Sequence, residues 1–418
     1  MSTRVLVTSM TTSRTTIRRF VATGALAWTL LLGARAHAQA QCISLESNGQ
    51  FVRHTLFLGR VDPVVGDLGE RDATFLKGPG LAAGSTTSGE QVVSFEATNY
   101  PGYYLRHQLY SMVLNKDDGT PSFKDDATFV VRPGRANPRQ VSFESKNYPN
   151  HFIRKGFAQG LVIAQPGPFD ATFDSDVTFS IAEPRSKSEC GNNKKDPVII
   201  VAGTLSPWLL YEAMRHRLQR EGYNAYIFEL PTLGMQDMKL SSSALGALAD
   251  KVRARLRATK VDLIGHSQGA EVSRSYVKYA GGAKLVDSLI SLGGAHYGTT
   301  VADSVFTPVL GATCVACKQL SPSSQYLRDL NGQDDAPGTV SYTNFVTKLD
   351  VIIQPYTSGL LKSTRSTNIN VTVQDQCLVD LVDHIGMIYD GPVLSGILNA
   401  LAHQPVALNC LAPLNLLP

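Results

Sequence analysis

Hydrophobic and polar residues change their pattern once along this chain, near residue 190. Before that point, short segments rich in β-branched and aromatic residues alternate with Gly, Pro and Asp, which predicts strands joined by turns. From about Lys195, apolar strand patterns alternate with helical ones, which is typical of a mainly parallel sheet. The pattern predicts an all-β domain over residues 42–190 and an α/β domain over residues 195–418.

The α/β part has ten segments with a clear pattern. Leu245, Leu248, Val252 and Leu256 recur at helical spacing, for example, and Val261–Ile264 is a short apolar run. We predict strands at 197–201, 224–230, 261–264, 285–292, 341–347 and 368–373, and helices at 207–221, 242–258, 270–279 and 391–402.

The all-β part contains an internal repeat of about 50 residues. Each of three segments within 43–184 has an aromatic-aliphatic-basic run followed by an Asp-x-Thr-Phe run. Units that cannot bury their faces alone are expected to pack together, which predicts a threefold all-β domain. The runs are Phe51–His54 with Asp72–Phe75, Tyr104–His107 with Asp126–Phe129, and Phe152–Lys155 with Asp176–Phe179.

The repeated stretch resembles the sugar-binding domain at the C-terminus of arabinofuranosidase B enzymes, which is a β-trefoil. The resemblance implies that one histidine and one aspartate in each repeat hold an arabinofuranose side group. Carboxylate and imidazole groups complement the donors and acceptors of sugar hydroxyls. The matching residues are His54 with Asp72 in the first repeat, His107 with Asp126 in the second, and Asp176 in the third. The third repeat has Lys155 where the histidine belongs. Alternatively, the basic and acidic residues of each repeat only tie its lobe together.

Gly265-His266-Ser267-Gln268-Gly269 stands between a predicted strand and a predicted helix. G-x-S-x-G in this context is the nucleophile elbow of α/β hydrolases, with glycines where the tight turn leaves no room for a side chain. A serine hydroxyl needs a base to become a nucleophile. We expect Ser267 to be that nucleophile; the alternative is a serine in an ordinary strand–helix turn.

The acid and the base should follow the serine in the chain, in that order. Asp350 follows the strand predicted at 341–347, and His384 lies between the last strand and the last helix. We predict that Asp350 orients His384 and stabilises its charged form. The other candidates are Asp303 and Asp335 for the acid, and His296 and His403 for the base; Asp383 is expected to be solvated or structural.

The oxyanion of a tetrahedral intermediate needs hydrogen-bond donors. One is expected to be the backbone N–H of Gln268, directly after the nucleophile. The second is expected from the loop after Val201, at Thr204, whose hydroxyl we predict as a third donor.

The α/β part contains four further motifs, Val198–Thr204, Val261–Gly269, Leu292–Thr299 and Asp383–Gly386. They are similar to motifs of the secreted triacylglycerol lipases of the group called lipase class 2. That resemblance implies an α/β hydrolase that cleaves acyl esters and needs no cofactor. Ala202 departs from the pattern, because many relatives have histidine there.

The first 38 residues read as a secretory signal peptide. Arg18 and Arg19 precede the apolar run at 20–32, and Ala36-His37-Ala38 has the form of a cleavage site. The run is shorter than the roughly 20 residues that span a bilayer, which argues against a membrane anchor. We expect a secreted protein, and the export route stays open.

Charge supports neither nucleic acid nor an anionic membrane as a partner. Five of the 39 basic residues and none of the 35 acidic ones lie in residues 1–41, which leaves 34 basic and 35 acidic groups beyond them. A balanced charge gives no electrostatic footprint for a polyanion. We expect a monomer whose partners are an acyl ester and an arabinose-containing polysaccharide.

Six cysteines fit an oxidising compartment. From their positions, we predict three pairs: Cys42–Cys190 around the all-β domain, Cys314–Cys317, and Cys377–Cys410 near the C-terminus. A metal role for Cys314-x-x-Cys317 is disfavoured, because no second cysteine or histidine pair accompanies it.

Three functions remain open. The favoured one is a lipase or carboxylesterase. The second is an esterase of acetyl or feruloyl xylan that is targeted by the sugar-binding domain. The third, a non-catalytic carbohydrate-binding protein, is disfavoured because serine, acid and histidine all occur in order.

Overall fold

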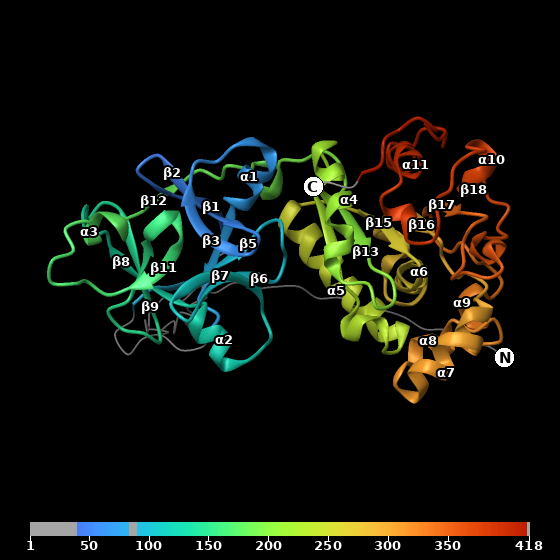
Figure 1. Cartoon of the computed structure of the whole chain (residues 1–418), viewed down its shortest axis with the longest axis horizontal. Helices are drawn as coiled ribbons and strands as arrows, with labels where there is room; N and C mark the ends of the chain where they lie inside the picture. The colour runs from blue at the N-terminus through green and yellow to red at the C-terminus, as the bar shows by residue number, and fades with distance from the viewer. Residues whose placement is uncertain (1–39, 83–89, 416–418) are drawn as a thin grey trace, which may run out of the picture. The chain divides into compact units, whose positions relative to one another are not determined.

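The structure, a computed structural model, describes residues 40–82 and 90–415 (Figure 1). The predicted signal peptide at 1–38 lies outside these residues. Within the described ranges, no helix combines the length and the apolar character needed to cross a membrane.

The N-terminal part is all-β, with a short helix in each repeat. Its twelve described strands form one sheet that closes through pairings of β11 with β7 and of β5 with β6. The elements are β1 (Gln41–Ser47), β2 (Gln50–Thr55), β3 (Leu58–Asp62), α1 (Gly66–Asp72), β4 (Phe75–Pro79), β5 (Val92–Ala97), β6 (Tyr103–Gln108), β7 (Ser111–Lys116), α2 (Pro121–Asp126), β8 (Phe129–Pro133), β9 (Val141–Ser145), β10 (Phe152–Lys155), β11 (Leu161–Ala164), α3 (Phe173–Asp176) and β12 (Ser180–Ala182).

The three sequence repeats correspond to equal sets of elements, each of four strands and one short helix. Antiparallel pairs β4–β5, β8–β9 and β1–β12 join one repeat to the next. The phenylalanines that end the Asp-x-Thr-Phe runs, Phe75, Phe129 and Phe179, are fully buried in one shared core. Each repeat thus contributes the same residue to a common centre, as expected for units that cannot bury their faces alone.

The C-terminal part is an α/β hydrolase-like domain with a parallel six-stranded sheet in the order β14-β13-β15-β16-β17-β18. Its elements are β13 (Val198–Val201), α4 (Glu212–Arg220), β14 (Ala225–Phe228), α5 (Met238–Leu256), β15 (Val261–His266), α6 (Gln268–Tyr279), β16 (Val286–Leu292), α7 (Thr307–Leu310), α8 (Val315–Gln319), α9 (Gln325–Asn331), β17 (Ser341–Val346), β18 (Asn368–Thr372), α10 (Val373–Gln376) and α11 (Gly391–Leu401).

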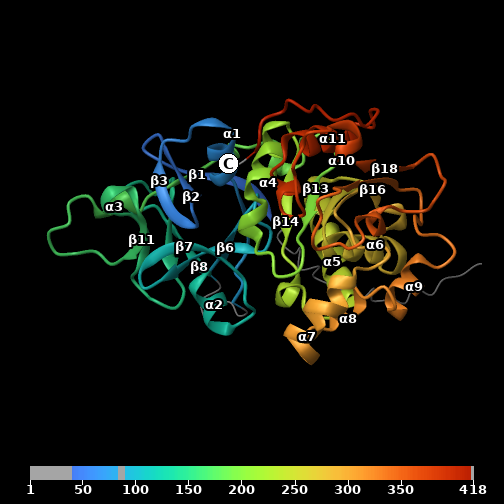
Figure 2. The same cartoon turned by 45° about the vertical axis from the view of Figure 1, so that its right-hand side comes forward.

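Strand β13 shows why this sheet is buried on both faces. Ile199 and Val201 pack in one core cluster with residues of α5 and α6. Val198 and Ile200, which point to the other face, pack with residues of α4 and α11. Since successive strand residues alternate between faces, an unbroken apolar run needs a layer of helices on each side (Figures 1 and 2).

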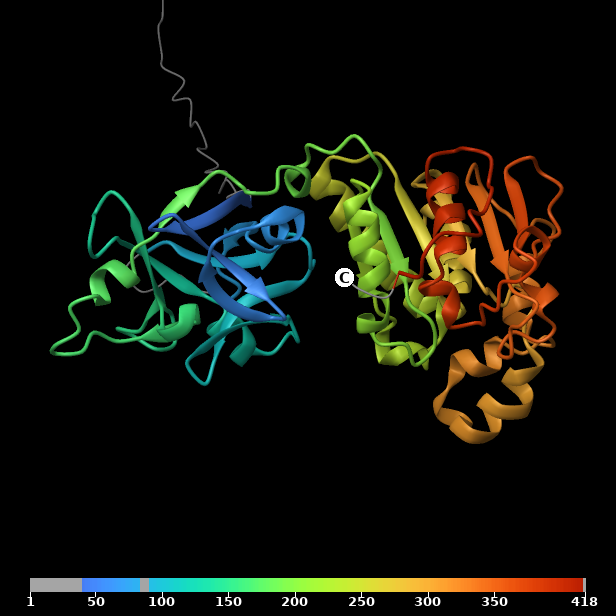
Figure 3. The same ribbon diagram turned by 45° about the horizontal axis from the view of Figure 1, so that its top comes forward.

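All six predicted strands of this domain are present, with ends within two residues of the predicted positions. Two helices differ. The one predicted at 242–258 begins at Met238, since the Asp237 side chain caps it by accepting from the Lys239 N–H. The one predicted at 207–221 starts with a 3-10 turn at 208–211. The helices between residues 302 and 331 were not predicted; the orange helices α7, α8 and α9 gather together in Figure 3.

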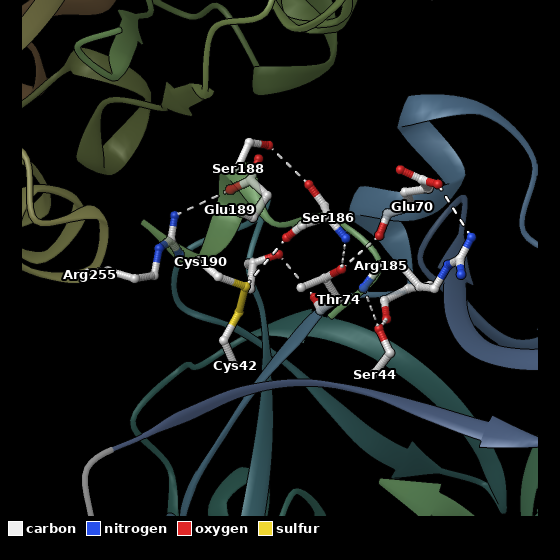
Figure 4. Close-up of a disulfide and its surroundings, with 12 residues drawn as sticks. Cys42, Ser44, Glu70, Thr74, Arg185, Ser186, Ser188, Glu189, Cys190 and Arg255 are labelled. Carbon is white, nitrogen blue, oxygen red and sulfur yellow. Dashed lines mark hydrogen bonds and ion pairs between the residues drawn. A yellow bond between two sulfur atoms is a disulfide. The ribbon is translucent and has the colours of Figure 1, made fainter. Parts of the chain in front are cut away.

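The three predicted disulfides, Cys42–Cys190, Cys314–Cys317 and Cys377–Cys410, are confirmed. Figure 4 shows the first of them beside segment 185–190. The backbone N–H groups of Arg185 and Ser186 donate to the hydroxyls of Ser44 and Thr74. This segment, which joins the all-β part to the α/β part, is therefore fixed by a covalent bond and by hydrogen bonds.

Glu189 is a second anchor of the same segment, and it is fully buried. Its carboxylate accepts from Arg71 at 2.6 Å and from the Tyr226 hydroxyl at 2.7 Å, with Arg255 at 3.8 Å. Arg71 belongs to α1, whereas Tyr226 and Arg255 belong to β14 and α5. A buried carboxylate is tolerated only when paired, so these cations and the hydroxyl hold the segment at this position.

Candidate active site

Ser267 lies at the sharp turn between β15 and α6. Its backbone has φ +54° and ψ −128°, a conformation that residues with a side chain rarely adopt. Such a conformation costs about 1–3 kcal/mol and persists only where the surroundings enforce it. The sequence thus forms the strained elbow that the G-x-S-x-G pattern predicts.

The two glycines of the motif are sterically required. A Cβ on Gly265 would lie 2.5 Å from Cα of Ala270, and one on Gly269 would lie 2.1 Å from the carbonyl oxygen of Val201. Both contacts are with backbone atoms that cannot move aside. Helix α6 therefore starts directly against β13 and β15, which fixes the position of Ser267.

Asp350 and His384 form a buried pair. His384 Nδ1 donates to Asp350 Oδ2 at 2.8 Å, while Oδ1 accepts the backbone N–H groups of Ile352 and Ile353 at 2.8 and 2.7 Å. Both side chains are almost completely buried. With Nδ1 protonated, Nε2 of His384 is the ring nitrogen free to accept a proton.

Ser267 and His384 both adjoin Leu292 and Gly293. The Ser267 N–H donates to the Leu292 carbonyl at 2.9 Å. A Cβ on Gly293 would lie 2.9 Å from His384 Nδ1, so a glycine is needed beside that ring. Among the described residues no hydrogen bond joins Ser267 Oγ to His384.

The loop after β13 lies against the elbow. A Cβ on Gly203 would be 3.1 Å from Ser267 Cβ, and the Gly203 N–H donates to the Tyr211 hydroxyl. The Thr204 hydroxyl donates to Gln268 Oε1 at 2.5 Å, so it is not free to be the predicted third donor. The Thr204 N–H has no acceptor among the described residues, which leaves it available beside the N–H of Gln268.

His266, the variable residue before the serine, links this loop to the base. Its Nε2 lies 3.0 Å from the His384 carbonyl oxygen, which can only accept, so Nε2 carries the proton. Nδ1 then accepts from the Tyr211 hydroxyl at 2.9 Å. Burial and the nearby His384 lower the pKa of His266 to about 3, which keeps it neutral. One hydrogen-bond chain thus runs from Gly203 through Tyr211 and His266 to His384.

A buried charged cluster supports the elbow from helix α6. Glu271 accepts from Arg274 at 2.8 Å and lies 2.7 Å from His296 Nδ1, and all three side chains are fully buried. His296 Nε2 in turn lies 3.1 Å from Asn344 Oδ1 on β17. Burial raises the pKa of Glu271, but His296 and Arg274 outweigh it and hold the pKa below its usual value. His296 thus anchors α6.

The other acid and base candidates lie in other networks. None of the following hydrogen-bonds to Ser267 or to the His384 ring in the described structure. Asp335 accepts from Tyr297 and from the Lys362 N–H, Asp303 accepts from Ser321, Asp383 accepts from the Gly386 N–H, and His403 pairs with Asp287.

The sugar-site residues of the first two repeats occur in matching triads. In the first triad, Asn99 Oδ1 lies 3.0 Å from His54 Nε2, and the amide nitrogen of Asn99 donates to Asp72 at 2.8 Å. In the second, Asn147 does the same for His107 and Asp126, at 2.9 and 2.7 Å. Neither asparagine was predicted as a site residue, although each opens a repeated Asn-Tyr-Pro motif.

Asp176 of the third repeat has different partners. It accepts from Arg154 Nη2 at 2.9 Å and from the Thr172 hydroxyl at 2.8 Å. Lys155, in the place of the histidine, bonds to Gln50 at 2.6 Å instead. Across the described residues, no cluster of three or more His, Cys, Asp or Glu side chains has the arrangement of a metal site.

Two family models match the chain, and each covers less than half of it. Residues 44–181 match the alpha-L-arabinofuranosidase B (ABFB) domain, and residues 197–356 match palmitoyl protein thioesterase. Alpha-L-arabinofuranosidase B of Emericella nidulans is 42% identical over 60 residues, which cover 14% of this chain and 11% of that protein. A probable alpha-L-arabinofuranosidase B of Aspergillus clavatus is 49% identical over 41 residues, 10% of this chain and 8% of that protein.

Solved structures with partial similarity include Aspergillus fumigatus lipase B, with 22% identity, a TM-score of 0.46, and coverage of 52% of this chain and 55% of that one. A GH54 arabinofuranosidase soaked with a cyclic sulfate inhibitor has 26% identity and a TM-score of 0.32, covering 36% of this chain and 33% of that one. The chain matches only about a tenth of the length of the two curated arabinofuranosidases. The chain therefore combines a segment that is similar to the ABFB domain with an α/β hydrolase-like domain that is similar to palmitoyl protein thioesterases.

Proposed function

We propose that this protein is a secreted serine hydrolase of fatty acyl esters. The observation that carries the proposal is the Asp350–His384 pair, buried beside the strained elbow of Ser267. A hydroxyl at such an elbow, with an oriented imidazole next to it, is the arrangement that generates an acyl-enzyme.

The reaction follows from these groups. His384 Nε2 accepts the proton of Ser267 as its Oγ attacks the ester carbonyl carbon, and Asp350 stabilises the resulting imidazolium. The N–H groups of Gln268 and Thr204 stabilise the oxyanion. His384 then donates its proton to the departing alcohol, and water hydrolyses the acyl-enzyme by the same steps.

Apolar side chains near the base favour a fatty acyl substrate over a small polar one. Leu378, Val379 and Leu381, on the segment that leads to His384, are 85%, 90% and 82% exposed, and Val351 beside Asp350 is 69% exposed. Exposed apolar side chains clustered in sequence around catalytic groups suit a lipid chain or surface. The match to palmitoyl protein thioesterases supports the same acyl class and adds thioesters as substrates.

The sugar domain supports a second candidate, an esterase of acylated plant polysaccharides. We propose that residues 42–190 form a β-trefoil that holds arabinofuranose groups through His54, Asp72, His107 and Asp126, ahead of a hydrolase domain at 195–418. Supporting observations are the two matching triads and the three equal sets of elements. Such a domain would place the enzyme on polysaccharide without changing its chemistry.

The test is a hydrolysis panel with p-nitrophenyl esters of increasing chain length, triolein, palmitoyl-CoA, and acetyl and feruloyl xylan. The proposal predicts the highest kcat/KM for long acyl chains, and a loss of several orders of magnitude in Ser267→Ala. Ser243→Ala, at an exposed serine of α5, is the matched control and should keep full activity. Activity on acylated xylan alone would favour the second candidate, and full activity of Ser267→Ala would refute both.

A further inference from the structure

The three repeats of the all-β part are joined to one another by the same kind of side-chain hydrogen bond. The last residue of each aromatic-aliphatic-basic run bonds to an amide side chain of the next repeat in cyclic order. These pairs are His54 with Asn99, His107 with Asn147, and Lys155 with Gln50, which closes the cycle from the third repeat to the first. The third repeat thus has a lysine at the position that holds the sugar-site histidine in the first two repeats.

Lys155 places an ammonium in the third repeat at the position where the first two repeats have an imidazole. The Lys155 ammonium donates to the uncharged amide oxygen of Gln50 at 2.6 Å, and no carboxylate of the described residues lies within 4 Å of it. An ammonium has three donors, so two remain. Within the described part of the chain, the Lys155 ammonium therefore has no ion-pair partner.

The neighbouring acidic residues are already neutralised in part. Arg154 bonds to both Asp170 and Asp176, at distances of 3.0 Å and 2.9 Å from its Nη2. This pairing with Arg154 overcomes burial and lowers the pKa of Asp170. The carboxylates are thus directed to Arg154, and Lys155 is the cation left to meet a ligand.

A cavity of about 380 Å³ lies at this position. Lys155, Arg154, Asp176 and Thr172 supply its polar groups, and Phe157 stands at its edge with a fully exposed ring. This volume suits one sugar residue, and an exposed aromatic ring offers a face for its C–H groups.

We propose that the third site binds the carboxylate of a sugar acid through Lys155, with the ring of that sugar beside Phe157. The inference rests on the proposed sugar-binding role of the all-β domain and extends it to a second class of ligand. One domain then recognises neutral furanose groups in the first two repeats and acidic sugars in the third.

The test compares methyl glucuronoside with methyl glucoside, which share a ring and differ mainly in the carboxylate, by titration calorimetry on the whole secreted chain. We expect wild type to prefer the glucuronoside about three- to fivefold at low salt, and less at high salt, as for a solvent-exposed ion pair. Lys155→Met should abolish the preference. Lys116→Met, at an exposed lysine of β7, is the matched control and should keep it.

Equal binding of the two sugars by wild type, or an unchanged preference in Lys155→Met, would overturn the inference. Circular dichroism confirms that each variant is folded. Methyl arabinofuranoside and Asp126→Asn separate the two proposals. If arabinofuranoside binds through Asp126 while the glucuronoside shows no preference, only the acidic site is refuted. If neither sugar binds, the sugar-binding role fails as well.

Discussion

Asp350 has both carboxylate oxygens engaged, one by backbone N–H groups and the other by His384 Nδ1. Asp350→Asn keeps the size and an oxygen for the backbone, but an amide next to Nδ1 favours the wrong tautomer of the histidine. We expect kcat on a soluble ester to fall by about 10³–10⁴-fold with the thermal unfolding temperature little changed. Asp303→Asn, at an exposed aspartate, should behave as wild type; near-normal kcat in Asp350→Asn would reject Asp350 as the acid.

His266 acts through its neighbours, since its two nitrogens bond to Tyr211 and to the His384 carbonyl. His266→Phe preserves an aromatic ring of similar size and removes both bonds. We expect kcat to fall about 10–100-fold with KM nearly unchanged, because misplacement by an ångström costs about this much. Tyr211→Phe, which removes the bonds to Gly203 and to His266 Nδ1 but keeps the bond from His266 to the His384 carbonyl, should have a smaller effect. A change confined to KM or to stability would show that His266 is merely structural.

Several site residues could be predicted from the sequence because a local motif or chain order marks them. Ser267 lies in G-x-S-x-G, and Asp350 and His384 follow it near strand ends. Tyr211 and His266 could not be linked in advance, since they are 55 residues apart and the motif leaves the position of His266 open. Asn99 and Asn147 were visible as repeats, but only the fold brings each to the histidine of the preceding repeat.

Asp390 is the N-cap of helix α11, a buried residue whose side chain accepts from the Val393 N–H at 2.7 Å. Burial raises the pKa of Asp390 to about 6. The folded state therefore holds this proton more tightly than the unfolded state, and stability falls as pH rises from about 4 to about 6. Asn caps a helix as well as Asp but has no charge to bury.

We expect Asp390→Asn to be more stable than wild type above pH 7, by up to about 3 kcal/mol, and to show little gain at pH 4. Urea unfolding at pH 4 and pH 8 measures the two differences. Asp375→Asn, at an exposed aspartate of α10, is the control and should not reproduce the trend. A gain that is the same at both pH values would mean that burial of the Asp390 charge is not its cause.

Helices and strands with a clear hydrophobic pattern in the sequence were predictable, and those that depend on tertiary contacts were not. Strands β13 and β14 are unbroken apolar runs, whereas residues 302–331 mix Gly, Pro, Ser and apolar positions without a helical period. Helix α8 there starts at Val315, whose N–H donates to the carbonyl of Met235. That bond joins parts of the chain about 80 residues apart, and no local pattern encodes it.

At the scale of the whole molecule, Cys42–Cys190 closes a loop with a sequence separation of 148 residues, which contains the entire all-β part. Replacing both cysteines by serine should lower the free energy of unfolding by about 2–5 kcal/mol, since the unfolded chain gains freedom. Cys314 and Cys317 are only three residues apart, so the same change there should cost much less. Equal losses in the two double variants would contradict this explanation.

The central claim is that Ser267 carries the acyl group, and covalent labelling tests it most directly. A long-chain alkyl fluorophosphonate reacts with an activated serine and leaves a stable adduct that mass spectrometry locates. We predict one adduct per wild-type chain, on the peptide that contains Ser267, and none on a folded Ser267→Ala variant. An adduct on another residue, or equal labelling of Ser267→Ala, would contradict the account.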